Sequence, residues 1–387
     1  MSDSGAGAGA AFVQFPAAGS GGRLPSVNSI ATSTEATDAW PAHMLVASYD
    51  DATVRLWDSR SPAVKPAAYI TAKRMPGEDT LEVANVAGRP ATIALCDSTV
   101  VEIDWRNPNA GPCAKWSHTE DLGALDRDAI RAGADTFAVC DDNGVTTVLK
   151  ACGLQPVAQF GEHDSISCGV ASLRGSGAVL SIGMEGSAKI WSGLDGRLME
   201  RSDLCDSCWR EKSPQMANPP IPACFDLRAD HAVVGRGDGS YAVVRVPALS
   251  KLQTAVGSAS VQLGMLDTIT FAPAHATNGL VSVAWASATN NDILLTAAVS
   301  GQVMLWDVSS TLAATVRAEA DGDEDDGEDG DEPACVFAFD MREDVPLKGA
   351  AAKGVDPAQI TVGCATVVGE SVAVGDNIGR VFLVPIQ

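Results

Sequence analysis

Basic residues are scarce in this sequence relative to acidic ones. The chain of 387 residues has 27 Lys and Arg against 49 Asp and Glu, and its formal net charge is −22. Direct binding to nucleic acid requires a Lys/Arg face that neutralises phosphates, so the composition disfavours that function. A basic protein partner is compatible with it.

Long hydrophobic runs are also missing. No stretch of 18 apolar residues occurs, and the N-terminus MSDSGAGAGA lacks the basic start and apolar stretch of a signal peptide. Most of the ten cysteines stand singly inside apolar runs, as Cys96, Cys140 and Cys364 do, which suits a reducing compartment. We therefore expect a soluble intracellular protein of the cytoplasm or nucleus, without a membrane partner and with residues 1–10 disordered.

Local catalytic motifs are absent as well. None of the five histidines stands in a nucleophile or metal-binding motif. They are His43, His118, His163, His231 and His275. We predict no catalytic residue, no cofactor and no enzymatic activity.

Pairs of apolar runs joined by short turns rich in Asp, Asn and Gly recur along the chain, which is the pattern of β-hairpins. Seven such hairpins are predicted, at residues 45–58, 92–104, 137–149, 180–191, 233–246, 292–307 and 372–384. Equivalent positions near the ends of the first four hairpins are Trp57, Ile103, Leu149 and Trp191. They are 46, 46 and 42 residues apart, close to the period of about 40 to 45 residues that is typical of propeller blades. No long helical period interrupts them.

This repeat predicts an all-β fold, a seven-bladed β-propeller formed by residues 11–387 as one domain. Insertions are expected near 202–222 and 319–358. A sheet with free edges aggregates, so the ring must close. Since the last hairpin is followed by no fourth strand, we predict that the N-terminal run 12–15 pairs with the final blade.

The endings Trp57-Asp58 and Trp306-Asp307 and the repeat from His163 to Trp191 resemble those of the WD-repeat β-propeller family. The resemblance implies a structural network in which His163, Ser181 and Trp191 tie the strands of one blade together, with Trp57 and Trp306 at equivalent positions. It also implies a protein-binding scaffold. The order of features along most of the chain is similar to one member of this family.

Two Asp-x-Arg boxes, Asp58–Arg60 and Asp104–Arg106, lie 46 residues apart, so their arginines should share one face of adjacent blades. Such pairs resemble those of substrate receptors that dock onto the propeller adaptor of cullin-RING ubiquitin ligases. Arginine suits this role because its planar guanidinium makes bidentate hydrogen bonds and often anchors interfaces. The alternative is that the aspartates end the strands and the arginines pair with neighbouring acids.

Two segments could suggest metal binding. Cys205 and Cys208 have zinc-ligand spacing, but only Cys224 and His231 could complete four ligands, so free thiols are favoured. The tract 321–332 carries nine acidic residues, yet Asp326 stands where a calcium loop needs glycine. We interpret it as a solvated acidic loop and predict no metal site.

Two functions follow as hypotheses. The first is a non-catalytic scaffold that acts as the substrate receptor of a cullin-RING ligase, binding the adaptor and a client as a monomer within the complex. The alternative is a general assembly or chromatin-associated scaffold that uses the acidic loop to bind basic partners.

Overall fold

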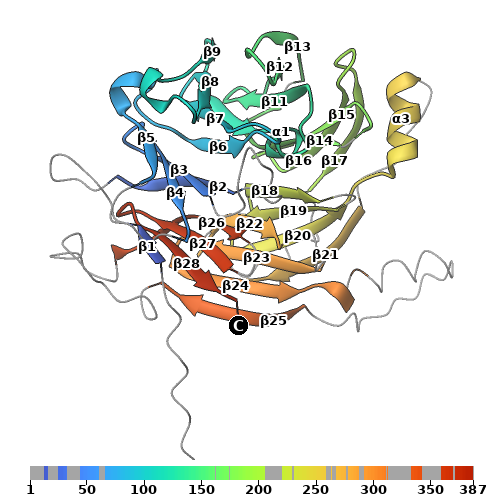
Figure 1. The fold of residues 1–387 in the computed structure, drawn as a ribbon. Helices are drawn as coiled ribbons and strands as arrows, with labels where there is room; N and C mark the ends of the chain where they lie inside the picture. The colour runs from blue at the N-terminus through green and yellow to red at the C-terminus, as the bar shows by residue number, and fades with distance from the viewer. Residues whose placement is uncertain are drawn as a thin grey trace, which may run out of the picture.

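Seven antiparallel sheets of four strands each follow one another around a ring in the computed structural model (Figure 1). The structure describes residues 13–15, 25–32, 44–60, 66–161, 163–173, 175–204, 220–228, 231–258, 263, 267–275, 278–286, 292–310, 312, 333–341, 359–368 and 371–386. The predicted all-β fold and its seven-bladed propeller architecture are thereby confirmed. Within these residues no helix is long and apolar enough to span a bilayer.

The blades are numbered here in chain order, and the first-named strand of blades 1 to 6 lies innermost. Blade 1 consists of β2 (Val27–Thr32), β3 (Met44–Tyr49), β4 (Val54–Asp58) and β5 (Ala68–Ile70). Blade 2 consists of β6 (Glu82–Asn85), β7 (Ala91–Cys96), β8 (Thr99–Asp104) and β9 (Ala114–Ser117). Blade 3 consists of β10 (Leu122–Leu125), β11 (Thr136–Asp141), β12 (Thr146–Lys150) and β13 (Pro156–Phe160). Blade 4 consists of β14 (Ser167–Leu173), β15 (Ala178–Gly183), β16 (Ser187–Ser192) and β17 (Leu198–Asp203).

The remaining blades follow the same order except for the last. Blade 5 consists of β18 (Pro222–Arg228), β19 (His231–Arg236), β20 (Ser240–Arg245) and β21 (Asp267–Pro273). Blade 6 consists of β22 (Leu280–Trp285), β23 (Ile293–Ala298), β24 (Gln302–Asp307) and β25 (Ala334–Asp340). Blade 7 runs outward through β26 (Val362–Val368), β27 (Ser371–Asp376), β28 (Val381–Pro385) and β1 (Val13–Phe15).

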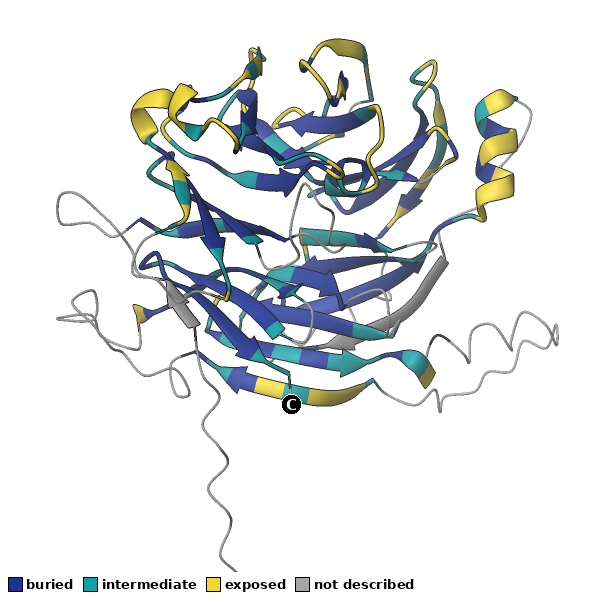
Figure 2. Cartoon of the chain, in the orientation of Figure 1, coloured by how far each residue is buried: buried dark blue, intermediate teal, exposed yellow. Residues whose placement is uncertain are grey.

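The second and third strands of every blade form one of the seven predicted hairpins. Both faces of these strands are covered, as in β15 and β16, where every residue is buried. The outermost strands are more exposed, as β13 and β25 show (Figure 2). At the turn of blade 5, Gly239 has φ +84°, and a Cβ there would lie 2.2 Å from the carbonyl oxygen of His275. Only glycine satisfies both conditions.

Seven apolar clusters make up the core, and each lies between two neighbouring blades. The cluster that contains Val27 and Tyr49 of blade 1 also contains Ala373 and Val381 of blade 7, so the first and last blades pack together. Gly363 fits this junction because a Cβ there would lie 2.2 Å from the carbonyl oxygen of Val27. Each blade therefore hides its faces against two others rather than in a core of its own.

The N-terminal strand closes the ring, as predicted. β1 pairs antiparallel with β28, with Val13 opposite Leu383 and Phe15 opposite Val381. Phe12, which was expected in this strand, lies outside the described residues, as do residues 1–10. Blade 7 thus combines the two ends of the chain, and the outer edge of β28 is covered.

Side chains on the innermost strands join neighbouring blades where no strand pairing exists. The carboxylate of Glu82 accepts a hydrogen bond from the amide of Leu125 in the next blade at 2.8 Å. The Asp226 carboxylate accepts a hydrogen bond from the amide of Trp285 at 2.9 Å. The Ser282 hydroxyl accepts one from the amide of Ala365 at 3.0 Å. These bonds satisfy amide groups that would otherwise be unpaired at a strand edge.

Several features of the described residues were not predicted from the sequence. They include the five-residue helix α1 (Arg127–Arg131) and the nine-residue helix α3 (Leu249–Gly257). The expected insertion at 319–358 contains β25, because the fourth strand of blade 6 follows the acidic tract. The expected insertion at 202–222 includes the end of β17 and the first residue of β18.

Removal of residues 1–15 should destabilise the ring, since β28 loses its outer neighbour. We expect a loss of about 1–4 kcal/mol in unfolding free energy from a few backbone hydrogen bonds, together with self-association of the exposed edge. Chemical denaturation and size-exclusion chromatography measure both effects. A chain lacking only residues 1–11 is the control and should behave as the full chain; equal behaviour of the two truncations would contradict the closure.

Candidate functional site

Two faces of the ring are distinguished by their connections. The hairpin face carries the turns between second and third strands and the links between blades. The α1 face carries α1 and the ends of the third strands, including Asp58 and Asp104. The candidate sites below are placed relative to these two faces.

A central cavity of about 610 Å³ is lined by the innermost strands of all seven blades. Six of these strands carry an irregular residue near their start, where the pairing register shifts. These residues, which all line the cavity, are Asn28, Gly123, Cys168, Ala223, Val281 and Gly363. β-bulges of this kind turn a side chain out of the regular alternation, so they define the wall of the channel near the hairpin face.

α1 supplies charged residues at the other end of the channel. Asp126 caps the helix by accepting a hydrogen bond from the amide of Ala129 at 3.0 Å, and it is completely buried. Arg127 reaches blades 1 and 2, donating to Ser29 Oγ at 3.0 Å and to Glu82 Oε1 at 2.6 Å. Burial raises the pKa of Asp126 to about 6, and hydrogen bonds to Ser172 and Ala129 oppose this.

His163, Ser181 and Trp191 are brought together inside blade 4. The indole N–H of Trp191 donates to Ser181 Oγ at 2.8 Å, and Ser181 Oγ lies 2.8 Å from His163 Nε2. His163 Nδ1 lies 2.6 Å from Glu185 Oε1. Burial lowers the pKa of His163, so the imidazole is neutral, accepts at Nε2 and donates at Nδ1.

This arrangement has the polarity of a Ser-His-acid catalytic triad, but its surroundings prevent nucleophilic chemistry. Ser181 is completely buried and its oxygen already accepts the bond from Trp191, so no substrate carbonyl can approach it. The links join the loop before blade 4 to its second and third strands. The network therefore stabilises the blade.

A second network of this kind was missed in the sequence. In blade 6 the indole of Trp306 donates to Thr296 Oγ1 at 2.9 Å, and Thr296 Oγ1 lies 3.1 Å from His275 Nε2. The hydroxyl residue precedes the tryptophan by ten positions in both blades, and this spacing was the available signal. Burial also lowers the pKa of His275.

Trp57, the other tryptophan predicted at an equivalent position, has no such hydroxyl residue ten positions before it. Trp57 is buried between blades 7 and 1, and the residue ten positions before it is Ala47, which has no hydroxyl. In blade 3, His118 Nε2 lies 2.9 Å from the carboxylate of Asp141, which also accepts amide bonds within its hairpin turn. His118, His163 and His275 each lie in the chain just before a blade and contact the second strand of that blade.

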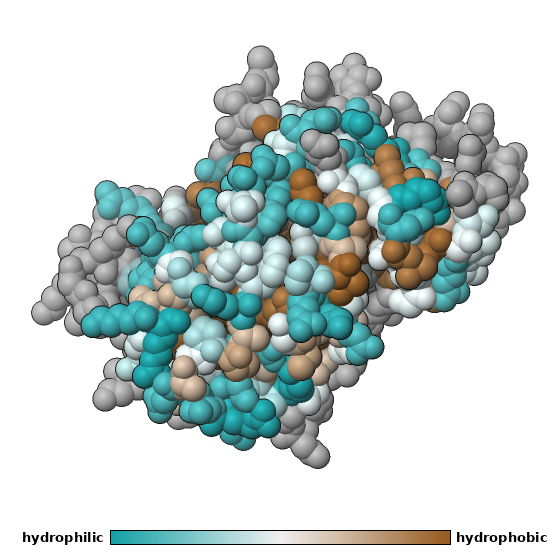
Figure 3. Space-filling model, turned by 90° about the horizontal axis from the view of Figure 1, so that it is seen from above, coloured by the Kyte–Doolittle hydropathy of each residue, from teal (hydrophilic) through white to brown (hydrophobic). Residues whose placement is uncertain are grey.

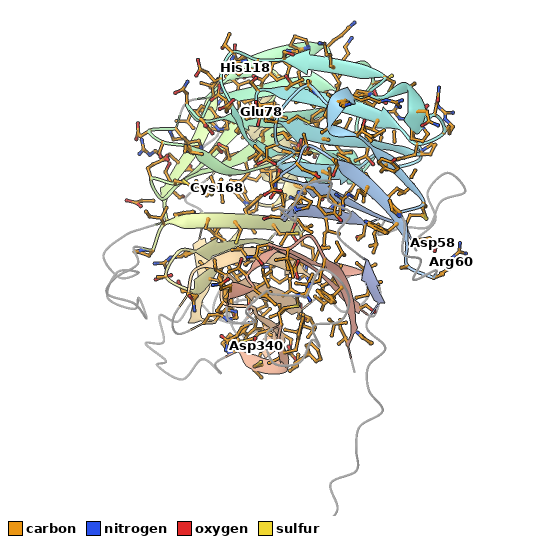
Figure 4. All side chains as sticks on the ribbon, turned by 90° about the vertical axis from the view of Figure 1, so that its left-hand side faces the viewer. Asp58, Arg60, Glu78, His118, Cys168 and Asp340 are labelled. Atoms are coloured by element: carbon orange, nitrogen blue, oxygen red, sulfur yellow. The ribbon has the colours of Figure 1, made fainter. Side chains whose placement is uncertain are left out.

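The two Asp-x-Arg boxes adopt the same conformation on adjacent blades. In each, the aspartate accepts a hydrogen bond from the arginine amide at 3.0 Å and binds the guanidinium through Nε and Nη2. Arg60 and Arg106 remain 66% and 75% exposed, and Figure 4 shows Asp58 and Arg60 at the edge of the molecule. The hydrogen bond to Asp58 raises the pKa of Arg60, and that from Arg106 lowers the pKa of Asp104.

The candidate metal ligands do not form a site among the residues that the structure describes, where no group of three His, Cys, Asp or Glu residues has metal-binding geometry. Cys224 lines the central cavity, and burial raises the pKa of its thiol to about 12. His231 is the first residue of β19 and pairs with Arg228, whereas Cys224 pairs with Gly235 near the other end of the strand. Cys205, Cys208 and the acidic tract 321–332 lie outside the described residues.

Replacing the shared hydroxyl of blade 4 should cost stability. Ser181→Ala leaves the indole N–H of Trp191 and Nε2 of His163 without their common partner, so we expect a loss of about 1–3 kcal/mol in unfolding free energy. Urea denaturation at neutral pH measures it. Ser250→Ala, at an exposed position of α3, is the matched control, and a Ser181→Ala variant as stable as this control would disprove the role.

Comparison with known proteins adds no closer assignment, since no family model matches the chain and no curated protein is significantly similar to it. The fold itself is a seven-bladed β-propeller and is consistent with the WD-repeat family. Propellers of this type are commonly protein-interaction scaffolds.

Proposed function

We propose that this protein is a non-catalytic interaction scaffold that docks a partner through Arg60 and Arg106 on its α1 face. The observation that carries the proposal is that two exposed arginines, one blade apart, are held in the same bidentate contact with their own aspartates. In the described part of the chain, Nη1 of neither arginine takes part in a hydrogen bond, so each retains donors for a partner.

The aspartates give the arginines a defined orientation before a partner arrives. A free arginine side chain loses considerable rotational freedom on binding, and a side chain that is already oriented loses less. Each box is also electrically balanced, because the Asp carboxylate neutralises the guanidinium. Neutral acceptors such as backbone carbonyls in the partner therefore suit the remaining N–H groups.

We further propose that the partner is the propeller adaptor of a cullin-RING ubiquitin ligase, which would make the protein a substrate receptor. Support comes from the resemblance of the paired boxes to those of such receptors. The order of features along the chain is also similar to WD repeat-containing protein 53. The proposal places the protein in the cytoplasm or nucleus and leaves the hairpin face and the central channel for a client.

A charge-reversal experiment tests the docking. The double variant Arg60→Glu, Arg106→Glu should fold normally, since both side chains are exposed, and lose at least about tenfold in affinity for the adaptor. Pull-down with the purified adaptor and calorimetry measure the loss.

The control for this experiment is the double variant Lys115→Glu, Lys150→Glu. It makes the same change in net charge at exposed positions outside the boxes and should retain binding. Retention of full affinity by the Arg60, Arg106 variant would refute this docking mode without affecting the scaffold assignment.

The alternative scaffold, which binds basic partners, is supported by charge on the hairpin face. Burial raises the pKa of Asp79, and the neighbouring charges of Asp50 and Asp97 add to the shift. Asp142 behaves likewise, since burial and the charge of Asp121 raise its pKa. Such carboxylates repel one another, and a cationic partner would relieve the repulsion.

Deletion of residues 321–332 distinguishes this alternative. If the acidic loop recruits basic partners, the deletion should abolish partner binding that is strong at about 50 mM salt and weak at about 300 mM. Co-purification from native cells at both salt concentrations gives the result. Partners that are insensitive to salt and to the deletion would exclude the alternative.

A further inference from the structure

A second cavity lies on the α1 face between blades 3 and 4, separate from the boxes. It has a volume of about 710 Å³, which is within the range of binding pockets. Its walls come from the start of β11, the turn between β14 and β15, and the loop after β16. We call it the blade 3–4 groove.

Most residues that line the groove are small or apolar, although polar atoms make up about half of its surface, and one of the apolar residues is exposed to solvent. Phe137, Leu173 and Val179 are buried in its wall, whereas Leu194 at the rim is 76% exposed. Leu194 is the most exposed of the large hydrophobic residues described in the chain. In the view of the molecule from above, hydrophobic residues appear among hydrophilic ones around blades 2 to 4 and α3 (Figure 3).

Small residues make the groove accessible to a peptide backbone. Gly175, Gly177 and Gly193 lie on the side of blade 4, and alanines of α1 and its following loop lie on the side of blade 3. At Gly193 a Cβ would lie 2.7 Å from the carbonyl oxygen of Gly177, so this glycine serves the packing of blade 4 itself. Gly175, Gly177 and the alanines leave room for an extended main chain. The apolar walls then accommodate side chains on one side of that peptide.

Arg131 gives the groove a charge preference. This residue of α1 lines both the groove and the central channel and is half-buried. Among the described residues it makes no hydrogen bond or ion pair, unlike Arg127 four positions earlier. Burial raises the pKa of the Asp226 carboxyl, and the positive charges of Arg131 and Arg127 partly oppose this shift. The Asp226 carboxylate accepts its hydrogen bond from the amide of Trp285.

Apart from this longer-range interaction with Asp226, the guanidinium of Arg131 is half-buried and makes no hydrogen bond or ion pair with the described residues, in a chain with 49 acidic and 27 basic residues. A carboxylate that enters the groove would meet Arg131 where water is partly excluded, and such bidentate contacts are among the stronger hydrogen bonds in proteins. Because Arg131 also faces the channel, the groove is not closed at this end. The carboxylate can therefore belong to a side chain inside a peptide.

We propose that the blade 3–4 groove binds an extended peptide segment of a partner protein that carries an Asp or Glu side chain near an aliphatic residue. The carboxylate pairs with Arg131, and the aliphatic side chain packs against Leu194 and the apolar wall. This site differs from the proposed adaptor-docking site, because no residue of the two Asp-x-Arg boxes lines the groove.

An array of amidated heptapeptides tests the proposal with the full-length protein. Each peptide has one Glu and one Leu in a background of Ala and Ser, at every mutual spacing from one to four residues. We expect a subset to bind, to lose binding when Glu is replaced by Gln, and to bind less at high salt. The same peptides with Gln and a free C-terminal carboxylate should not bind; binding of these alone would overturn the choice of an internal acidic residue.

Variants of the protein assign the binding to the groove. Arg131→Gln and Leu194→Ser should each weaken the best peptide at least about tenfold in fluorescence polarisation. Lys73→Gln and Val336→Ser are controls, since both residues are exposed and lie in other blades, and they should bind as the unaltered protein does. The proposal would be overturned if the controls lost as much peptide affinity as the groove variants, or if both groove variants kept their affinity. An array in which no peptide binds would also overturn it.

Thermal melting verifies that the variants fold, and adaptor binding provides a second readout. Arg131→Gln should leave adaptor affinity unchanged. The two readouts therefore test peptide binding in the groove and adaptor docking separately, so that one proposal can fail without the other.

Discussion

The apolar faces of each blade are covered only by its two neighbours, and the rest of the structure depends on this constraint. Seven hydrophobic clusters, one at each junction, take the place of a single core. Removing one junction would expose two apolar faces at once, so the ring is stable only when closed. The pairing of β1 with β28 and the packing of Val27 against blade 7 meet this requirement with the two ends of the chain.

Polar groups inside the ring follow from the same constraint. Innermost strands of adjacent blades pack without pairing, and Glu82, Asp226 and Ser282 supply acceptors for amides across the junctions. Within blades, tryptophan, hydroxyl and histidine form relays such as Trp191, Ser181 and His163. A buried polar group without a partner is costly, so these relays hold the outer loops to the strands. His163 and Ser181, whose arrangement resembles part of a catalytic triad, are engaged in this way.

Function is thereby left to the loops at the two faces. The α1 face presents two pre-oriented arginines and, apart from them, the blade 3–4 groove with Arg131. The hairpin face is acidic, with Asp79 and Asp142 near other carboxylates. Two faces of different chemistry on one rigid ring suit a scaffold that holds two proteins at once.

The sequence by itself determined the strand order, the seven hairpins, the closure by the N-terminal strand and the position of the boxes. These features depend on local patterns: apolar runs, Asp/Asn/Gly turns and a period near 45 residues. The helix α1, the partner of Arg127 in another blade and the groove beside Leu194 were decided only by the tertiary structure. A five-residue helix is too short to show a period. Contacts between blades join residues that are distant in the sequence, such as Arg127 and Glu82, so nothing in the local sequence specifies which side chains meet.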